Sequence, residues 1–180
     1  FLQKNSYDVI LYGSIVTHYR WVKWLTKKIK QYHPTTTVVI GNSVAGSCPD
    51  IFLANAPADI VVIGEGEDTT IEALDCIRAE KDLAMVEGIA WRAADGQIVH
   101  NKKRKARKTV DEFPMVDWSL FETNKYRAKR SFLIDETDSS DLGMPVATAR
   151  GCVFRCTFCH FVFWDDPYRY RSPDSILDEV

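Results

Sequence analysis

Two hydrophobic periodicities alternate along the first 80 residues. Short runs rich in valine and isoleucine occupy residues 7–16, 37–41 and 58–64, and each run ends at or near a glycine. Continuous apolar runs of this length are typical of strands that are buried on both faces of a parallel sheet. The pattern therefore predicts three parallel strands in this part of the chain.

The segments between these runs have a helical period. Residues 18–32 place lysines on one helical face and apolar side chains on the other, at Tyr19, Val22, Leu25, Ile29 and Tyr32. Two more helices are predicted, a short one at 48–56 and another at 67–80. On the helix at 67–80, the face expected to be buried carries Ile71, Leu74 and Ile77.

Alternating strands and helices predict an α/β fold, a doubly wound, Rossmann-like parallel sheet. Ligands of such sheets lie beyond the carboxyl ends of the strands. Those ends carry Ser14, Gly41 with Asn42, and the stretch from Gly64 to Glu67. A second interpretation stays open, in which these residues only end strands and supply the acids that a helix dipole favours in the first turn.

The pattern changes after residue 85. Two strand-like runs flank Asp95–Gly96, which is a strong hairpin signal. The basic run at 102–108 beside them is typical of a solvated sheet edge. We therefore predict an α/β domain at 1–85, and a hairpin with a linker at 86–143.

Residues 144–180 predict the opening unit of another domain. A strand-like run leads into a loop with three cysteines, and Ser172 with Pro173 then marks the start of a helix. One strand, one loop and part of a helix cannot bury a core of their own. We therefore expect the remainder of that domain, including its substrate-binding residues, to follow Val180.

Composition narrows the class of protein. The 180 residues are 46% hydrophobic and carry a net charge of -2, values typical of a globular protein with no bulk attraction to nucleic acid. No apolar run approaches the roughly 20 residues that span a bilayer, and no signal peptide is apparent. Five cysteines, three of them in one loop, fit a reducing compartment. We expect a cytoplasmic protein with neither a membrane span nor a nucleic-acid partner.

The cysteine loop is the strongest chemical signal in the chain. Cys152, Cys156 and Cys159 have the spacing C-x3-C-x2-C. Three thiolates on a short loop suit one soft metal centre, and a 4Fe-4S cluster held by three cysteines keeps one iron open. Zinc with His160 as fourth ligand is an alternative, although neighbouring residues rarely bind one metal in good geometry. Unliganded or disulfide-bonded cysteines are the third alternative, which this spacing disfavours.

With Phe158 immediately before the last cysteine, this motif resembles the signature of radical S-adenosylmethionine (SAM) enzymes. Upstream stretches at 8–16, 38–46, 58–74 and 88–99 resemble the cobalamin-binding domain that precedes the barrel in some of these enzymes. The chain is thus similar to a cobalamin-binding-domain-containing radical SAM protein. The resemblance implies part of the cobalamin-binding domain, a linker and the first β-α unit of a radical SAM barrel.

The resemblance also implies roles for the cysteine loop. Cys152, Cys156 and Cys159 would hold a 4Fe-4S cluster whose open iron binds the amino and carboxylate groups of SAM, and the backbone of Phe158 would lie near the adenine. One electron, from a donor such as flavodoxin or ferredoxin, would release a 5'-deoxyadenosyl radical from SAM. That radical would abstract hydrogen from a small-molecule substrate and lead to methyl transfer to an unactivated carbon or to oxidative cyclisation.

For cobalamin, the resemblance implies a site at the strand ends: Ser14, Gly41, Asn42, Gly64, Glu65 and Gly66. Ser14 with Val16 occupies the place of a Ser-x-Leu element, and Gly41 with Asn42 that of a Gly-Gly pair. The Asp-x-His-x-x-Gly motif, which supplies an axial histidine in some relatives, is absent from the sequence. A different class of function stays open, a corrinoid- or nucleotide-binding module with an electron-transfer iron-sulfur site or a structural zinc site.

Overall fold

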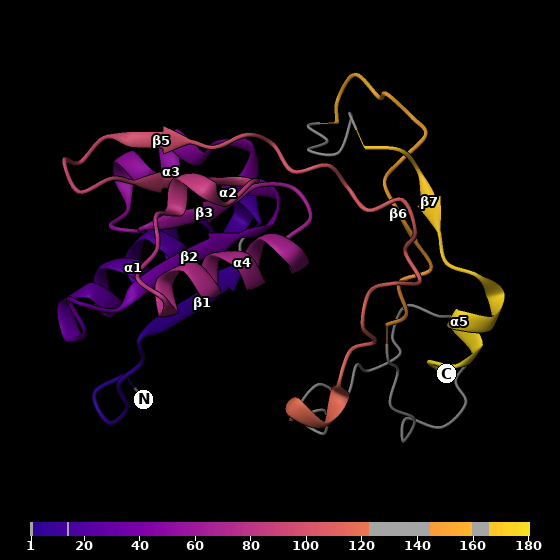
Figure 1. Cartoon of the computed structure of the whole chain (residues 1–180), viewed down its shortest axis with the longest axis horizontal. Helices are drawn as coiled ribbons and strands as arrows, with labels where there is room; N and C mark the ends of the chain where they lie inside the picture. The colour runs from indigo at the N-terminus through magenta and orange to yellow at the C-terminus, as the bar shows by residue number, and fades with distance from the viewer. Residues whose placement is uncertain (1, 14, 123–144, 160–165) are drawn as a thin grey trace. The chain divides into compact units, whose positions relative to one another are not determined.

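The computed structural model describes residues 2–13, 15–122, 145–159 and 166–180 (Figure 1). Within these ranges, no helix is long and apolar enough to cross a bilayer. The chain forms two compact units, Phe1–Ala106 with Val153–Pro167, and Arg107–Cys152 with Tyr168–Val180. The domain boundaries expected from the sequence, after residues 85 and 143, stay predictions.

A five-stranded mixed sheet forms the centre of the first unit. Strands β1 (Val9–Gly13), β2 (Thr37–Gly41) and β3 (Ile60–Val62) are parallel. Strands β4 (Ile89–Arg92) and β5 (Ile98–His100) form an antiparallel hairpin, and β4 pairs with β3. The order in the sheet is β1-β2-β3-β4-β5. The predicted parallel strands and the hairpin are therefore confirmed, and the hairpin extends the parallel sheet.

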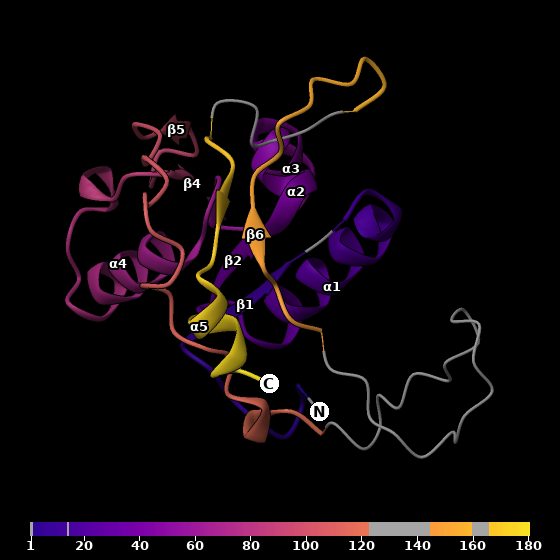
Figure 2. The ribbon, with the colours of Figure 1, turned by 90° about the vertical axis from the view of Figure 1, so that its right-hand side faces the viewer.

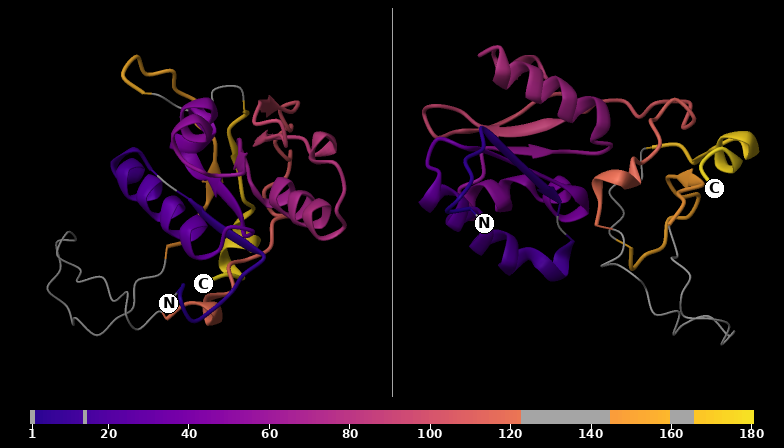
Figure 3. Two further views of the ribbon diagram at one scale, coloured as in Figure 1. Left: turned by 90° about the vertical axis from the view of Figure 1, so that its left-hand side faces the viewer. Right: turned by 90° about the horizontal axis from the view of Figure 1, so that it is seen from below.

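Helices cover both faces of this sheet. Helices α1 (Tyr19–Tyr32), α2 (Asn42–Ser47) and α3 (Pro49–Asn55) connect the parallel strands and share one face, whereas α4 (Glu67–Arg78) covers the other (Figures 2 and 3). The predicted doubly wound α/β architecture is confirmed, with α2 as an additional helix. Short 3-10 turns lie at Val16–His18, Leu83–Met85 and Trp118–Leu120.

Side chains of the central strands alternate between two hydrophobic cores. Val38 and Ile40 of β2 face the core beneath α1, α2 and α3, whereas Val39 faces the core beneath α4. Phe52 is the largest fully buried side chain, and the ring of Tyr19 meets it edge to face at a centroid distance of 5.0 Å. Because β2 and β3 are buried on both faces, apolar runs without alternation are what these strands require.

Threonine replaces an apolar residue at a core-facing position of two helices. Thr26 of α1 and Thr69 of α4 are fully buried, and the hydroxyl of Thr26 donates to the carbonyl oxygen of Val22 at 2.7 Å. Ile71, expected on the buried face of α4, is instead 61% exposed, and Tyr32 of α1 is also exposed. Both helices are therefore oriented with a threonine hydroxyl toward the core. Hydrophobic spacing alone predicts an orientation that buries Ile71 and Tyr32 instead.

The second unit contains a small ladder and a helix. Strands β6 (Ala149–Arg150) and β7 (Arg169–Tyr170) pair antiparallel, and helix α5 (Pro173–Leu177) follows. The side chain of Ser172 caps α5 by accepting the backbone N–H of Ser175 at 3.2 Å. The strand and the helix start predicted for this region are therefore present in the structure.

Gly88 and Gly96 provide a matched test of packing in the first unit. Both have positive φ, but a Cβ on Gly88 would lie 3.0 Å from Oγ1 of Thr69, whereas one on Gly96 would meet nothing within 4 Å. We expect Gly88→Ala to lower the free energy of unfolding by about 2–5 kcal/mol and Gly96→Ala by about 1–2 kcal/mol. Urea denaturation followed by circular dichroism measures both, and equal losses would contradict this packing.

Candidate functional site

The carboxyl ends of β1, β2 and β3 meet at one edge of the sheet, because the three strands are parallel. Gly13 at the end of β1 lies opposite Gly41 at the end of β2. Asn42 follows directly, and the turn Gly64–Gly66 follows β3. The structure thus brings the predicted cofactor residues of β2 and β3 to the same edge. Ser14, the predicted residue of β1, lies outside the described residues.

Asn42 shapes the edge between β1 and β2. Its φ is 73°, in the left-handed region that asparagine tolerates better than most residues, and its side-chain oxygen accepts the backbone N–H of Ser43. A Cβ on Gly13 would lie 3.2 Å from the Cβ of Asn42. The absence of a side chain at Gly13 therefore makes room for the asparagine that replaces the second glycine of the expected pair.

The turn Gly64–Gly66 is open on its outer side. Gly64 has a φ of 82°, and a Cβ built there would meet nothing within 4 Å. Gly66 precedes α4, and its carbonyl oxygen accepts the backbone N–H of Thr70 at 2.7 Å. Glu67 and Asp68 occupy the first turn of α4, where the helix dipole favours acids. The turn thus leads into the helix and also leaves open space beside Gly64, so the two interpretations are compatible.

Small residues and bare backbone let a large cofactor approach the strand ends closely. The edge has glycines at the ends of β1 and β2, and a Cβ on Gly41 would meet, among the described residues, only Val62 at 4.0 Å. Close approach of backbone to a ligand is a common reason for glycine at such positions. The residues present therefore fit a corrinoid seated on the strand ends.

The three cysteines of the loop carry unoxidised thiols. Cys152 is exposed, whereas Cys156 and Cys159 are half-buried. The backbone N–H of Cys159 donates to the carbonyl oxygen of Cys156 at 3.0 Å, so one tight turn joins these two residues. Phe158 lies inside this turn and is 91% exposed. None of these cysteines forms a disulfide in the structure.

The donor set suits a thiolate-bound centre, although its members are not gathered into one. In the part of the chain that the structure describes, no three His, Cys, Asp or Glu side chains cluster as a metal site. Cys152 ends a segment of the second unit, and Cys156 and Cys159 belong to the first. His160, the alternative zinc ligand, falls among the residues that are not described. The ligand set from the sequence stays a prediction.

An aromatic ring anchors the strand that leads into the cysteine loop. The guanidinium groups of Arg107 and Arg150 lie 5.1 and 4.0 Å from the ring centroid of Phe113. Arg150 ends β6, two residues before Cys152, and Arg169 of β7 donates to the carbonyl oxygen of Arg107 at 2.5 Å. Residues 107–113, expected to be a linker, therefore brace the β6–β7 ladder.

Asp111 extends this brace to helix α5. Its carboxylate oxygens accept the backbone N–H of Ser172 at 2.9 and 3.2 Å. This backbone hydrogen bond lowers the pKa of Asp111. Close by, Arg171 and Glu179 form a largely buried ion pair, and Arg171 also donates to the carbonyl oxygen of Ser175 at 2.6 Å. The start of α5 is thereby tied to the same segment as Phe113.

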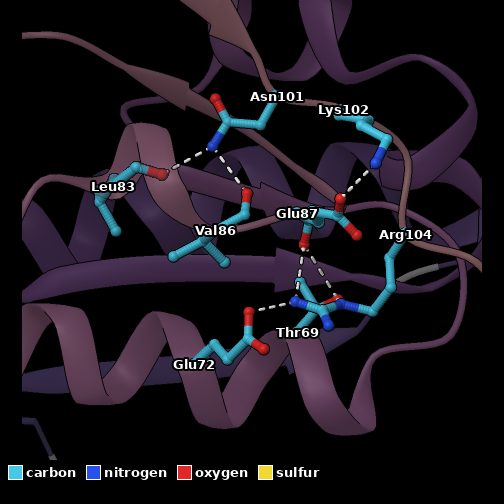
Figure 4. Close-up of polar contacts among 8 residues, drawn as sticks. All are labelled: Thr69, Glu72, Leu83, Val86, Glu87, Asn101, Lys102 and Arg104. Carbon is cyan, nitrogen blue, oxygen red and sulfur yellow. Dashed lines mark hydrogen bonds and ion pairs between the residues drawn. The ribbon is translucent and has the colours of Figure 1, made fainter.

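Sequence reasoning missed the amide that holds the hairpin against the rest of the first unit. Asn101 donates to the carbonyl oxygens of Leu83 and Val86 at 2.6 and 2.7 Å (Figure 4). Its side-chain oxygen accepts the indole N–H of Trp91 at 3.1 Å. These contacts join residues far apart in sequence, so no local pattern signals them.

Comparisons with known proteins bear on both parts of the chain. Residues 1–74 match the family model of the B12 binding domain. The resemblance to cobalamin-binding radical SAM proteins is confirmed. The chain is 32% identical over 156 residues to an anaerobic magnesium-protoporphyrin IX monomethyl ester cyclase of Rubrivivax gelatinosus, covering 84% of this chain and 26% of the relative.

Two solved structures share the fold. The cobalamin-dependent SAM radical enzyme OxsB, solved with aqua-cobalamin bound, matches with a TM-score of 0.72 and 21% identity, over 96% of this chain and 22% of OxsB. The radical SAM methyltransferase TsrM from Kitasatospora setae, solved with cobalamin and a [4Fe-4S] cluster bound, matches with a TM-score of 0.66 and 20% identity. That match covers 99% of this chain and 35% of TsrM. The chain thus spans about a third of these proteins or less.

Asp111 gives a direct test of the brace. Because folding lowers its pKa below the ordinary value of 3.8, its contact with Ser172 stabilises the folded state above that value and is lost as pH falls through the lowered pKa. We expect a carbon-13 NMR titration of the Asp111 carboxyl to give a midpoint below 3.8 in the folded chain and near 3.8 in concentrated urea. The same midpoint in both states would rule out the brace.

Proposed function

We propose that the strand-end edge of the first unit binds cobalamin. The observation that carries this proposal is the open Gly64–Gly66 turn, which lies beside Gly41 and Asn42 within the segment that matches the B12 binding domain. Glu65 lies at the middle of that turn, and Ser14 is the remaining residue that the sequence assigns to the site. The backbone of these residues would approach the corrin or its nucleotide tail, with Asn42 offering an amide.

We further propose that the parent protein is a radical SAM enzyme of the cobalamin-dependent type. Cys152, Cys156 and Cys159 would hold a 4Fe-4S cluster, and the exposed turn at Phe158 would place backbone beside the adenine of SAM. When bound, such a cluster supplies the electron that breaks the sulfonium carbon–sulfur bond of SAM, giving methionine and a 5'-deoxyadenosyl radical. Methyl transfer to an unactivated carbon or oxidative cyclisation of a small-molecule substrate would follow.

The names of the similar proteins support this choice of reactions. TsrM is a methyltransferase, and the relative from Rubrivivax gelatinosus is a cyclase. This chain would bind and orient the cofactors, and flavodoxin or ferredoxin would be the electron donor. The main alternative is a corrinoid-binding module whose three thiolates hold an electron-transfer cluster or structural zinc.

Anaerobic reconstitution with iron and sulfide separates these alternatives. We expect about four irons per chain and an absorption spectrum that changes on addition of SAM, because three thiolates keep one iron open. Cys156→Ser should lose the cluster, whereas Cys48→Ser should keep it, since Cys48 lies outside the motif. Stoichiometric zinc without a response to SAM would favour the structural alternative and sink the enzymatic one.

Gly64 and Gly96 form a matched pair for testing the cobalamin site. Their φ angles are 82° and 86°, and neither would place a Cβ within 4 Å of another group. Gly64→Ala and Gly96→Ala should therefore cost similar stability, but only the first adds a methyl group to the proposed site. We expect Gly64→Ala to weaken aquacobalamin binding about tenfold, roughly 1.4 kcal/mol.

Visible-absorbance titration of the two variants measures this difference, with the unaltered chain as reference. Gly96→Ala should bind like the unaltered chain because the hairpin turn lies outside the proposed site. Equal affinities of Gly64→Ala and the unaltered chain would remove the turn from the cobalamin site.

A further inference from the structure

Arg104 differs from its neighbours in the basic run that follows β5. Its side chain is only 20% exposed, whereas that of Lys102 is 76% exposed. Figure 4 shows the guanidinium reaching helix α4, where Nε donates to Oγ1 of Thr69 at 2.8 Å and Nη2 pairs with the carboxylate of Glu72. The expectation of a solvated edge therefore fails at this residue, although Lys102 satisfies it.

Thr69 depends on this guanidinium for one of its two hydrogen bonds. The threonine is fully buried, and its hydroxyl donates to the carbonyl oxygen of Glu87 at 3.3 Å while it accepts from Arg104. A hydroxyl can donate once and also accept, so both functions are used here. Removing Arg104 would leave a buried acceptor without its partner, which is costly and favours rearrangement of the start of α4.

Gly88 joins this network to the end of β3. Its carbonyl oxygen accepts the backbone N–H of Ile63 at 2.8 Å. A Cβ on Gly88 would lie 3.0 Å from Oγ1 of Thr69, 3.2 Å from the Cβ of Arg104 and 3.4 Å from the carbonyl oxygen of Ile63. Thr69, Arg104 and Ile63 therefore leave no room for a side chain at this glycine.

Ile63 and Thr69, which these contacts hold, flank the Gly64–Gly66 turn. Ile63 directly precedes Gly64, and Thr69 lies in the first turn of α4, three residues after Gly66. The hydrogen bond from the backbone N–H of Thr70 to the carbonyl oxygen of Gly66 links the first turn of α4 to the Gly64–Gly66 turn. Both ends of Gly64–Gly66 are thus held by contacts that converge on Gly88 and Arg104.

We propose that Arg104, acting through Thr69, is a positioning residue that fixes the Gly64–Gly66 turn for a corrinoid. This inference rests on the proposed cobalamin site and adds to it a residue outside the strand ends. Through Arg104, the segment that follows the hairpin is coupled to the cofactor edge. Backbone that must approach a ligand closely has to be held within a fraction of an ångström by such supporting contacts.

Three variants of the full 180-residue chain test the proposal. Arg104→Gln removes the charge and the fork of donors, and Arg104→Lys keeps the charge but cannot bond Thr69 and Glu72 in the same planar geometry. Arg78→Gln is the matched control, because it removes a guanidinium that forms an exposed ion pair with Asp75 on α4, the helix that Arg104 contacts. The readouts are amide hydrogen exchange, measured residue by residue, and affinity for aquacobalamin.

We expect Arg104→Gln to speed amide exchange over residues 63–70 while exchange in α1 stays unchanged, and to weaken aquacobalamin binding about tenfold. Arg104→Lys should fall between Arg104→Gln and the unaltered chain, and Arg78→Gln should match the unaltered chain. A purely structural role would instead speed exchange throughout the first unit.

The positioning role would be overturned if amide exchange in Arg104→Gln rose uniformly, or if its affinity for aquacobalamin equalled that of an unaltered chain that binds. Either result would leave the proposal of a cobalamin site standing. An unaltered chain that does not bind aquacobalamin would overturn both proposals. If Arg104→Gln does not fold, the exchange profile and affinity of Arg104→Lys decide by the same criteria.

Discussion

Parallel pairing of β1, β2 and β3 is the constraint on which the rest of the first unit depends. It requires connections that return across one face, which α1, α2 and α3 supply, and it collects three carboxyl ends at one edge. Since β2 and β3 are buried on both faces, their side chains belong to the cores, and a ligand can reach these strands at their ends. Gly41, Asn42 and the turn Gly64–Gly66 lie where the fold permits a ligand to reach backbone.

Polar contacts then decide how this edge is held. On the face beneath α4, Thr69, Asn101 and Arg104 add hydrogen bonds to the packing of the apolar core. Buried polar groups of this kind favour one arrangement, because a buried group that loses its hydrogen-bond partner raises the free energy of the folded state. In the second unit an exposed side chain has a comparable role, because the carboxylate of Asp111 accepts the backbone N–H of Ser172 at the start of α5.

Local patterns predicted much of this fold. The parallel strands, the hairpin at Asp95–Gly96 and the helix start at Ser172 each depend on neighbouring residues, so their signals are contained in short stretches. The predictions for Ile71 and Arg104 were wrong. Ile71 is exposed because α4 buries Thr69 instead, and Arg104 leaves the solvated basic run because it hydrogen-bonds Thr69. Such contacts join residues 18 to 35 positions apart, which no periodicity reports. The cysteine ligand set was predicted by spacing and stays a prediction.

The central claim is that the strand-end edge of the first unit is a cobalamin site. Equilibrium dialysis of the 180-residue chain against aquacobalamin tests it most directly, because it needs neither SAM, nor a cluster, nor a substrate. The account predicts saturable binding of about one aquacobalamin per chain, as one edge with one open turn allows. Dialysis that shows no saturable binding would contradict it.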